Sequence, residues 1–197
     1  AALSLESGLL VWVAAVWAWC LGWRGVSRWG ILAMTAGVAA YFAVRFLWLQ
    51  TGTPGLVERS TGFGFGIATS DEIQRLFGQR PFLFYAYNIS GALLMLFFAE
   101  PRGGVYLFIR GFVIGPHEPW VLLNVACATG VTLLIATAFW RRRAHLRSGL
   151  SHHDRVLLML PVMAAANAVF CYTYLKDVVL SVAGVFVAAA AYAALRD

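Results

Sequence analysis

Charged residues are scarce in this chain. They make up 12% of its 197 residues, whereas ordinary soluble domains carry about 25%. Hydrophobic residues make up 61%, and the mean hydropathy is +0.75. Because a soluble domain of this length could not bury so much apolar surface, the shortage of charge argues against a soluble protein and predicts a membrane protein.

Lysine is nearly absent, cysteine pairs and histidines within the apolar runs are absent, and each shortage argues against a kind of site. Lys176 is the single lysine, so the glycine-rich run GFGFG (62–66) has neither a phosphate-binding lysine after it nor a predicted strand before it. The three cysteines form no CxxC pair, which is typical of buried free thiols. No histidine lies within a predicted span. His152-His153, beside Asp154, has too few neighbouring ligands to hold a metal, and we interpret this segment as a solvated loop. We therefore predict no metal site and no nucleic acid partner, and any cofactor is unknown.

Long apolar runs are what the sequence has in abundance. A membrane-spanning helix needs about 20 mostly apolar residues, and we predict spans near residues 3–23, 31–49, 120–140, 156–175 and 178–195. The expected fold is therefore all-α, a polytopic membrane helix bundle of about five or six spans in a single transmembrane domain. Because the chain begins with Ala1 rather than methionine, it is also compatible with a fragment of a longer protein.

The arginines predict the orientation of the bundle. The segment 140–155 holds five of them, and the positive-inside rule places it in the cytoplasm together with Arg24 and Arg28. Both placements hold only if the chain crosses the membrane an even number of times between residues 50 and 119. We therefore predict that residues 81–115 form a membrane-associated hairpin, re-entrant or interfacial. The alternative is an ordinary crossing by residues 81–99, which places Arg24 and Arg28 outside.

Residues 50–80 then form an exoplasmic loop. Thr69 and Glu72 have the spacing of a capping box, and Asp71 and Glu72 fall in the first turn, where the helix dipole favours acids. Ile73, Leu76 and Phe77 share one face of that helix. The pattern predicts a short amphipathic helix lying on the bilayer surface.

Arg45 lies inside the second predicted span, where a charge costs up to about 3 kcal/mol near the bilayer centre. Its side chain either extends outward to the interface or has a partner, an acid or a phosphate. Arg59, Lys176 and the acids of the loop are expected on the same side. If the helices bring them together, they form a polar chamber for a ligand with an anionic head and an apolar tail, such as polyprenyl phosphate. The alternative is salt bridging within a structural loop.

A long exoplasmic loop with acids near its membrane attachment is similar to the large-loop membrane glycosyltransferases of the GT-C class. The closing segment CYTYLKDVVLSVAGVFVAAAAYA resembles the late span in which those enzymes carry an aromatic-basic pair followed by small residues. The segments RFLWLQTGTPGLVERS and FFAEPRGGVYLF resemble uncharacterised bacterial membrane proteins. The class carries its catalytic acid in an early external loop that this chain lacks. The resemblance therefore fits the carboxy-terminal half of such an enzyme or a relative without catalysis.

Two hypotheses of function follow, both for a protein of the bacterial cytoplasmic membrane. In the first, the protein transfers a sugar from a polyprenyl-phosphate carrier at the exoplasmic face. Asp71 or Glu72 acts as the base, and the lipid phosphate is held by Arg45, Arg59 and Lys176. In the second, it is a non-catalytic transmembrane subunit that packs against a larger membrane complex through faces of small residues. Those faces hold Ala36, Gly37, Ala40 and Ala43, and later Ala183, Gly184 and Ala188.

Overall fold

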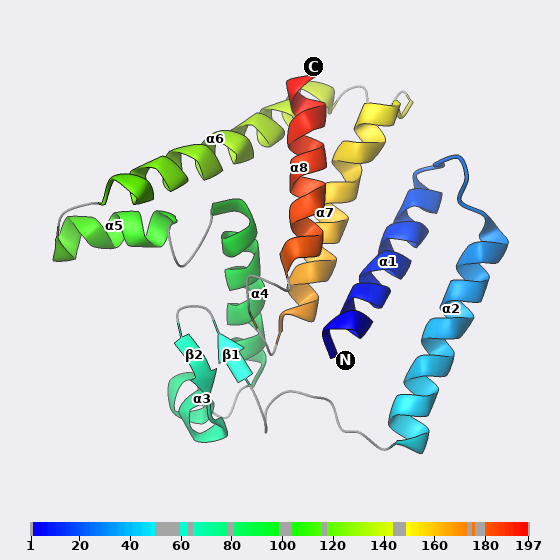
Figure 1. Cartoon of the computed structure of the whole chain (residues 1–197), viewed down its shortest axis with the longest axis horizontal. Helices are drawn as coiled ribbons and strands as arrows, with labels where there is room; N and C mark the ends of the chain where they lie inside the picture. Colours follow the sequence, from blue (N-terminus) through cyan, green and yellow to red (C-terminus); the bar gives the residue numbers. More distant parts are fainter. Residues whose placement is uncertain are drawn as a thin grey trace.

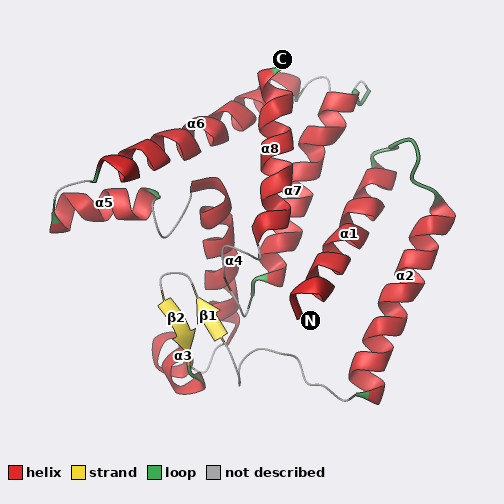
Figure 2. Cartoon of the chain, in the orientation of Figure 1, coloured by secondary structure: helices red, strands yellow, loops and turns green. Residues whose placement is uncertain are grey.

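The structure is a computed structural model that describes residues 2–49, 60–62, 65–78, 81–98, 104–115, 118–143, 149–172, 175 and 180–196. Its elements are, in chain order, α1 (Ala2–Cys20), α2 (Arg28–Ala43), the π-helical turn η1 (Val44–Trp48), β1 (Ser60–Gly62), β2 (Phe65–Ala68), α3 (Ser70–Phe77), α4 (Pro81–Phe98), α5 (Val105–Ile114), α6 (Pro119–Arg142), α7 (His152–Phe170) and α8 (Ser181–Leu195). Figures 1 and 2 show their arrangement.

The described part of the chain is helical apart from one small antiparallel hairpin. Its two strands, β1 and β2, pair Ser60 with Ala68 and Thr61 with Ile67. The all-α prediction is therefore correct for the bulk of the fold. It missed this hairpin, which lies in the predicted exoplasmic loop at residues 60–68.

Two helices in the described residues are long and apolar enough to cross a membrane, judged by length and composition. They are Arg28–Trp48 and Pro119–Arg142. A third candidate arises if α3 and α4, which meet at a bend of 86°, are counted as one broken span. The shorter apolar helices Gly8–Cys20 and Ser181–Leu195 do not reach the required length. Helices that suit a membrane are therefore present, but the predicted count of five or six spans is not confirmed.

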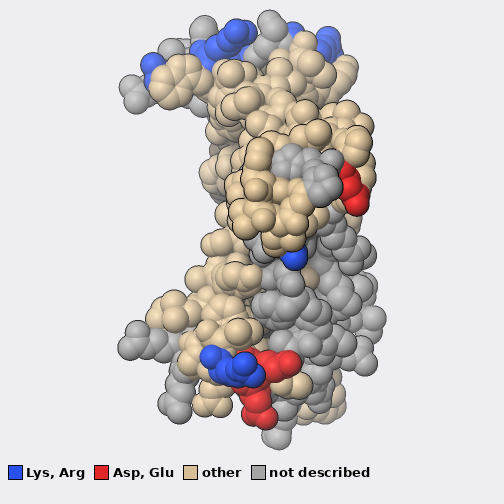
Figure 3. Space-filling model, turned by 90° about the vertical axis from the view of Figure 1, so that its left-hand side faces the viewer, with Lys and Arg blue, Asp and Glu red and all other residues tan. Residues whose placement is uncertain are grey.

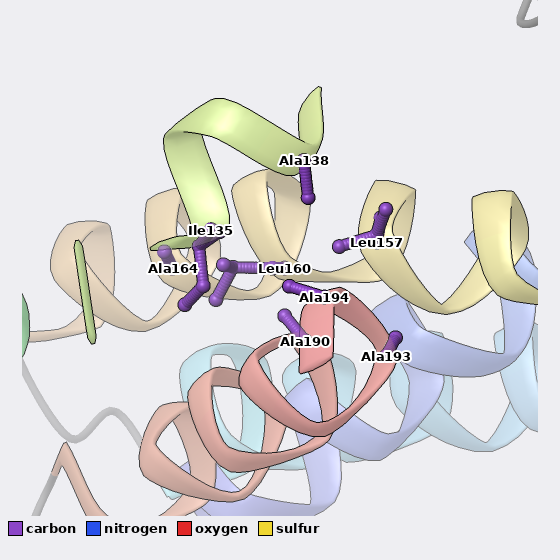
Figure 4. Packing of buried hydrophobic residues seen from close by; sticks show 8 residues of the cluster. All are labelled: Ile135, Ala138, Leu157, Leu160, Ala164, Ala190, Ala193 and Ala194. Carbon is purple, nitrogen blue, oxygen red and sulfur yellow. The ribbon is translucent and has the colours of Figure 1, made fainter. Parts of the chain in front are cut away.

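Helix α7 lies at the centre of the bundle. On one side, its residues Leu157, Leu160 and Ala164 form a buried cluster with α6 and α8 (Figure 4). The α8 members of the cluster are all alanines, whose small side chains let the backbones of α7 and α8 approach closely. The cluster residues from those two neighbours are Ile135, Ala138, Ala190, Ala193 and Ala194.

The other faces of α7 hold α1 and α4. Met159 and Met163 of α7 pack against the α1 side of the bundle, and the indole nitrogen of Trp17 donates a hydrogen bond of 2.9 Å to the carbonyl of Leu158. On the α4 side, Ala92 is fully buried near Ala168. Helices α8, α1 and α4 therefore pack along α7, and α6 contacts it through the buried cluster, which makes α7 the core of the fold.

Two parts of the fold extend away from this core. Helix α2 packs against α1, and none of its residues is buried. Helix α5 and the first turns of α6 lie on the opposite side of the molecule (Figure 1). These segments expose large apolar side chains, among them Trp29, Leu32, Phe112 and Val113. Exposed apolar side chains in such number suit a lipid environment better than water.

The α1–α2 connection, which holds Arg24, meets the start of α7, which holds Arg155, at one end of the bundle. The guanidinium of Arg155 donates a hydrogen bond of 2.8 Å to the carbonyl of Gly22. The ring of Trp23 contacts the ring of His152 edge-on, with 5.4 Å between the centroids. Figure 3 shows several basic residues at the upper end of the molecule, whereas those at the lower end lie beside acids. The α1–α2 connection and the start of α7 therefore lie at the same end of the bundle, as the predicted topology requires, and their cytoplasmic placement stays a prediction. The turn expected for the hairpin near residue 100 lies outside the described residues, so the hairpin stays a prediction.

This shared end leads to a test of topology. In a background in which Cys20 and Cys127 are replaced by alanine, we expect Arg24→Cys and Arg143→Cys to react with an impermeant thiol reagent from the same side of the membrane. Gln74→Cys, on α3, should react from the opposite side. All three positions are exposed. Labelling of the two arginine positions from opposite faces would contradict the shared end and the even number of crossings.

Candidate functional site

Helix α3 begins with the capping box that the sequence predicts. The backbone N–H of Glu72 donates to the Thr69 hydroxyl at 3.3 Å, and the backbone N–H of Thr69 donates to a Glu72 carboxylate oxygen at 2.9 Å. The same oxygen also accepts from the Thr69 hydroxyl at 3.3 Å. These bonds satisfy backbone donors that the first turn of a helix leaves without intrahelical partners. The Glu72 carboxylate therefore has a structural role, which weakens its candidacy as a catalytic base.

The apolar face of α3 lies against the protein rather than lying free on a bilayer surface. Ile73 is buried, and Phe77 packs on the fully buried ring of Phe84 in α4, with 5.4 Å between the ring centroids. Leu76 belongs to the same predicted face but is 63% exposed. The helix is amphipathic as predicted. Its apolar face, however, covers the start of α4 and leaves only Leu76 for contact with lipid.

Asp71 is the acid of this helix that the cap does not use. It stands in the first turn of α3, next to Glu72, and its side chain is exposed. Both predicted catalytic acids are exposed, and Asp71 is the one whose carboxylate is not engaged in the cap.

Arg45 lies in the π-helical turn η1 that continues α2. Its guanidinium donates a hydrogen bond of 2.9 Å to the hydroxyl of Tyr41, one turn earlier, and lies 5.8 Å from the centroid of the Phe46 ring. The side chain is half-buried. Tyr41 is a neutral partner that the sequence alternatives, an acid or a phosphate, did not include.

The structure does not bring Arg45 together with Asp71 and Glu72, the predicted site residues that it describes. Figure 1 places α3 and the end of α2 that leads into η1 at the same end of the molecule but on opposite sides of it. Arg45 is therefore remote from Asp71 and Glu72. Arg59 and Lys176 lie outside the described residues. The polar chamber expected from the sequence is not assembled by the residues whose positions are described.

A buried ion pair connects the end of α6 to the start of α7. Asp154 is 2% exposed, and one of its carboxylate oxygens lies 3.0 Å from the guanidinium of Arg142. The other oxygen accepts from the backbone N–H of Ser151 at 2.9 Å, and the Ser151 hydroxyl accepts from the backbone N–H of Asp154 at 3.2 Å. The sequence interpretation treated this segment as a solvated loop. Ser151 and Asp154 have the Ser-x-x-Asp spacing of a capping box, and this spacing would have identified the segment as the start of a helix.

The surroundings of Asp154 lower its pKa. Burial alone would raise the pKa, because a charged carboxylate is poorly solvated away from water. The hydrogen bonds from Ser151 and from Arg142 outweigh burial and hold the pKa below its usual range. The ionised form is therefore the stable one in the folded protein. The pair joins two helices and does not itself form an open site, so we assign it a structural role.

In the described residues, no three His, Cys, Asp or Glu side chains lie close enough together to hold a metal ion.

Compared with known proteins, the chain matches no protein family, no curated protein and no solved structure. The resemblance to the GT-C class therefore stays an expectation, and a function has to be argued from the residues themselves.

The Asp154 pair gives a prediction for pH and stability. A carboxyl with a lowered folded-state pKa stabilises the fold above its unfolded pKa of about 4, and this contribution is lost as the pH falls through the folded value. We expect Arg142→Gln and Asp154→Asn each to lower the thermal unfolding midpoint in detergent, at a cost of about 1–3 kcal/mol at neutral pH. The cost of Asp154→Asn should shrink on acidification below about pH 4.

Arg141→Gln is the matched control, because Arg141 lies on the same turn of α6 and is exposed. It should leave the midpoint unchanged within about 0.5 kcal/mol. Equal effects of the Arg141 and Arg142 substitutions would show that net charge at this end, rather than the buried pair, sets the stability.

Proposed function

We propose that the protein is an integral membrane protein that acts as a non-catalytic subunit, and that α2 packs against a transmembrane helix of another chain. The observation that supports this most directly is a helix of membrane-spanning length with no buried residue and an exposed face of small side chains. We further propose that α1, α2, α7, α8 and the α4–α6 segment form the predicted membrane bundle, in a bacterial cytoplasmic membrane with the arginines inside.

The contact face of α2 can be identified from its burial pattern. Ile31, Met34, Val38 and Phe42 recur at helical spacing and are half-buried. Thr35, on the same side, accepts a hydrogen bond of 2.9 Å from the indole nitrogen of Trp12 in α1. This side of α2 therefore faces α1.

The opposite side of α2 carries small residues. Its exposed positions recur three or four residues apart, which places them on one stripe, and they are Ala33, Ala36, Gly37, Ala40 and Ala43. A Cβ atom added at Gly37 would meet nothing within 4 Å. We call this stripe the α2 small-residue face. Such stripes let helix backbones approach closely in a membrane, where van der Waals packing drives association.

Helix α8 shows how the chain uses small residues internally. Ala183 and Ala190 are buried against neighbouring helices, whereas Val185 and Tyr192 point outward. Of the other two small residues predicted on α8, Gly184 is half-buried and Ala188 is exposed. Ala183 and Ala190, the small residues with which α8 packs, are therefore covered by helices of the same chain. The α2 small-residue face is not covered, which favours a helix from another chain as its partner.

The face can be tested by cross-linking in native membranes. With a photoreactive residue at Gly37, we expect one adduct with another membrane protein, identified by mass spectrometry. Ala36→Leu and Ala40→Leu should remove that adduct, because the larger side chains keep the helices apart. The thermal unfolding midpoint of the purified protein should not change, since these side chains are exposed.

Val185→Leu, at an exposed position of α8, is the matched control and should leave the adduct intact. An adduct between two copies of this chain would contradict the proposal of a different subunit. Reaction with lipid alone would contradict helix packing through this face.

The sugar transferase is the second candidate, and the exposed carboxylate of Asp71 is the observation that favours it. In this proposal Asp71 takes the proton from the acceptor hydroxyl while the sugar passes from polyprenyl phosphate to the acceptor oxygen. Arg59 and Lys176 hold the phosphate, whereas Arg45 is too remote from Asp71 to share that site. Glu72 keeps its role in the cap.

This candidate predicts different results for the two neighbouring acids. With a polyprenyl-phosphate sugar as donor, Asp71→Asn should lower transfer by about 100-fold or more, the usual contribution of a general base. Glu72→Gln should instead lower the stability of α3 and change the rate much less, because its carboxylate serves the cap. Gln74→Ala is the control on the same helix. Unchanged transfer in Asp71→Asn would contradict catalysis by this residue.

A further inference from the structure

We propose that one end of the bundle binds the headgroups of anionic phospholipids. We call it the arginine end, and it is formed by Arg24, Arg28, Arg141, Arg142, Arg143, Arg155 and Arg196. The inference rests on the membrane placement proposed above, but not on the α2 small-residue face. It also concerns the opposite end of the molecule from the polyprenyl-phosphate site considered for Arg45.

Segments far apart in the sequence converge at this end. The hydrogen bond from Arg155 to Gly22 and the contact of Trp23 with His152 join the α1–α2 connection to the start of α7. The pair of Arg142 and Asp154 joins the end of α6 to the same turn of α7. The C-terminal alanines of α8 pack against the last turns of α6, and Figure 1 shows these helix ends together. The arginines are therefore held around one surface rather than scattered along the chain.

In the part of the arginine end that the structure describes, acids barely offset the positive charge. Among the described residues of the arginine end, Asp154 is the one acid, and it is buried in its pair with Arg142. Five of the arginines are exposed to a ligand, namely Arg24, Arg28, Arg141, Arg143 and Arg196. The described residues of α3, near the other end, include Asp71 and Glu72 beside Arg75. The charge of the molecule is therefore asymmetric along the bundle.

Aromatic rings stand beside three of the exposed arginines. The guanidinium of Arg143 lies 4.1 Å from the centroid of the Trp140 ring, and the matching distances are 5.6 Å for Arg28 and Trp29 and 5.7 Å for Arg196 and Tyr192. The three rings are themselves exposed, Trp140 to 68% and Trp29 to 69%. Exposed Trp and Tyr residues are typical of the headgroup level of a bilayer. The rings therefore place the guanidinium groups at the depth of lipid phosphates.

The chemistry of the cations and their surroundings selects a lipid phosphate. All seven cations are arginines, whose planar guanidinium groups bind phosphate oxygens in pairs. Below them, the helices expose apolar side chains, including Leu32 on α2 and Leu195 on α8. A ligand that satisfies both features has a phosphate head and an acyl tail. Clusters of four to eight basic residues next to a membrane helix commonly attract anionic lipids.

The test compares lipids bound to the purified full chain. The protein is equilibrated in mixed micelles of phosphatidylglycerol and phosphatidylcholine, repurified, and its bound lipids are measured by mass spectrometry. We expect enrichment of phosphatidylglycerol, and we expect the enrichment to fall at least about tenfold in the triple variant Arg24→Gln, Arg28→Gln and Arg143→Gln. Raised salt should weaken the enrichment in the unmodified protein, because exposed charges are screened.

Arg75→Gln combined with Arg110→Gln is the control, because it removes exposed arginines from other parts of the molecule. It should leave the enrichment unchanged. An equal loss in both sets of variants, or none in the triple variant, would overturn the proposal. Should the triple variant unfold, Arg141→Gln alone, at an exposed position, must still reduce the enrichment.

Competition distinguishes a lipid from free phosphate. Inorganic phosphate at millimolar concentration should leave the bound phosphatidylglycerol in place, and displacement by phosphate alone would overturn lipid recognition.

Washing membranes with alkaline carbonate separates this inference from the membrane placement. Release of the protein by carbonate would refute membrane integration itself, whereas retention without lipid enrichment would refute only the arginine end as a lipid site.

Discussion

Packing around α7 is the constraint on which the rest of the fold depends. Because this chain has few polar side chains, van der Waals contact between side chains of matching shape, rather than hydrogen bonding, holds most of its helices together. The alanines of α8 and the methionines of α7 fit this need in different ways, since one lets backbones approach and the other fills irregular space. Hydrogen bonds such as that from Trp17 to the carbonyl of Leu158 then fix the rotation of one helix against the next.

The features predicted correctly from the sequence depend on local chemistry or on charge. The capping box of Thr69 and Glu72 involves residues three apart, so its spacing alone identified it. That Arg24 and Arg28 lie at the same end as the arginines near α7 agrees with a rule about charge that does not depend on the details of packing. The helical character of the fold followed from the apolar runs.

The features that were missed depend on tertiary contacts. Whether the apolar face of α3 meets lipid or α4 depends on where Phe84 lies, and no pattern within α3 records that position. Asp154 looked like a solvated loop residue, and its burial follows from the approach of Arg142 on another helix. In the same way, the distance between α3 and the end of α2 is a property of the whole arrangement (Figure 1). The proposed transferase site depended on that distance, which the sequence could not supply.

The position of α2 has a consequence for how the sequence can evolve. Because α2 contributes no buried residue and is joined to the core through α1, most substitutions on its outer face leave the folding of the remaining helices intact. Substitutions in α7 have no such freedom. The rate at which mutations accumulate on α2 therefore depends on the contacts of its outer face with its surroundings. In the central helices, the rate depends on the packing of the helices against one another. Two selective pressures then act on separate helices of one small chain.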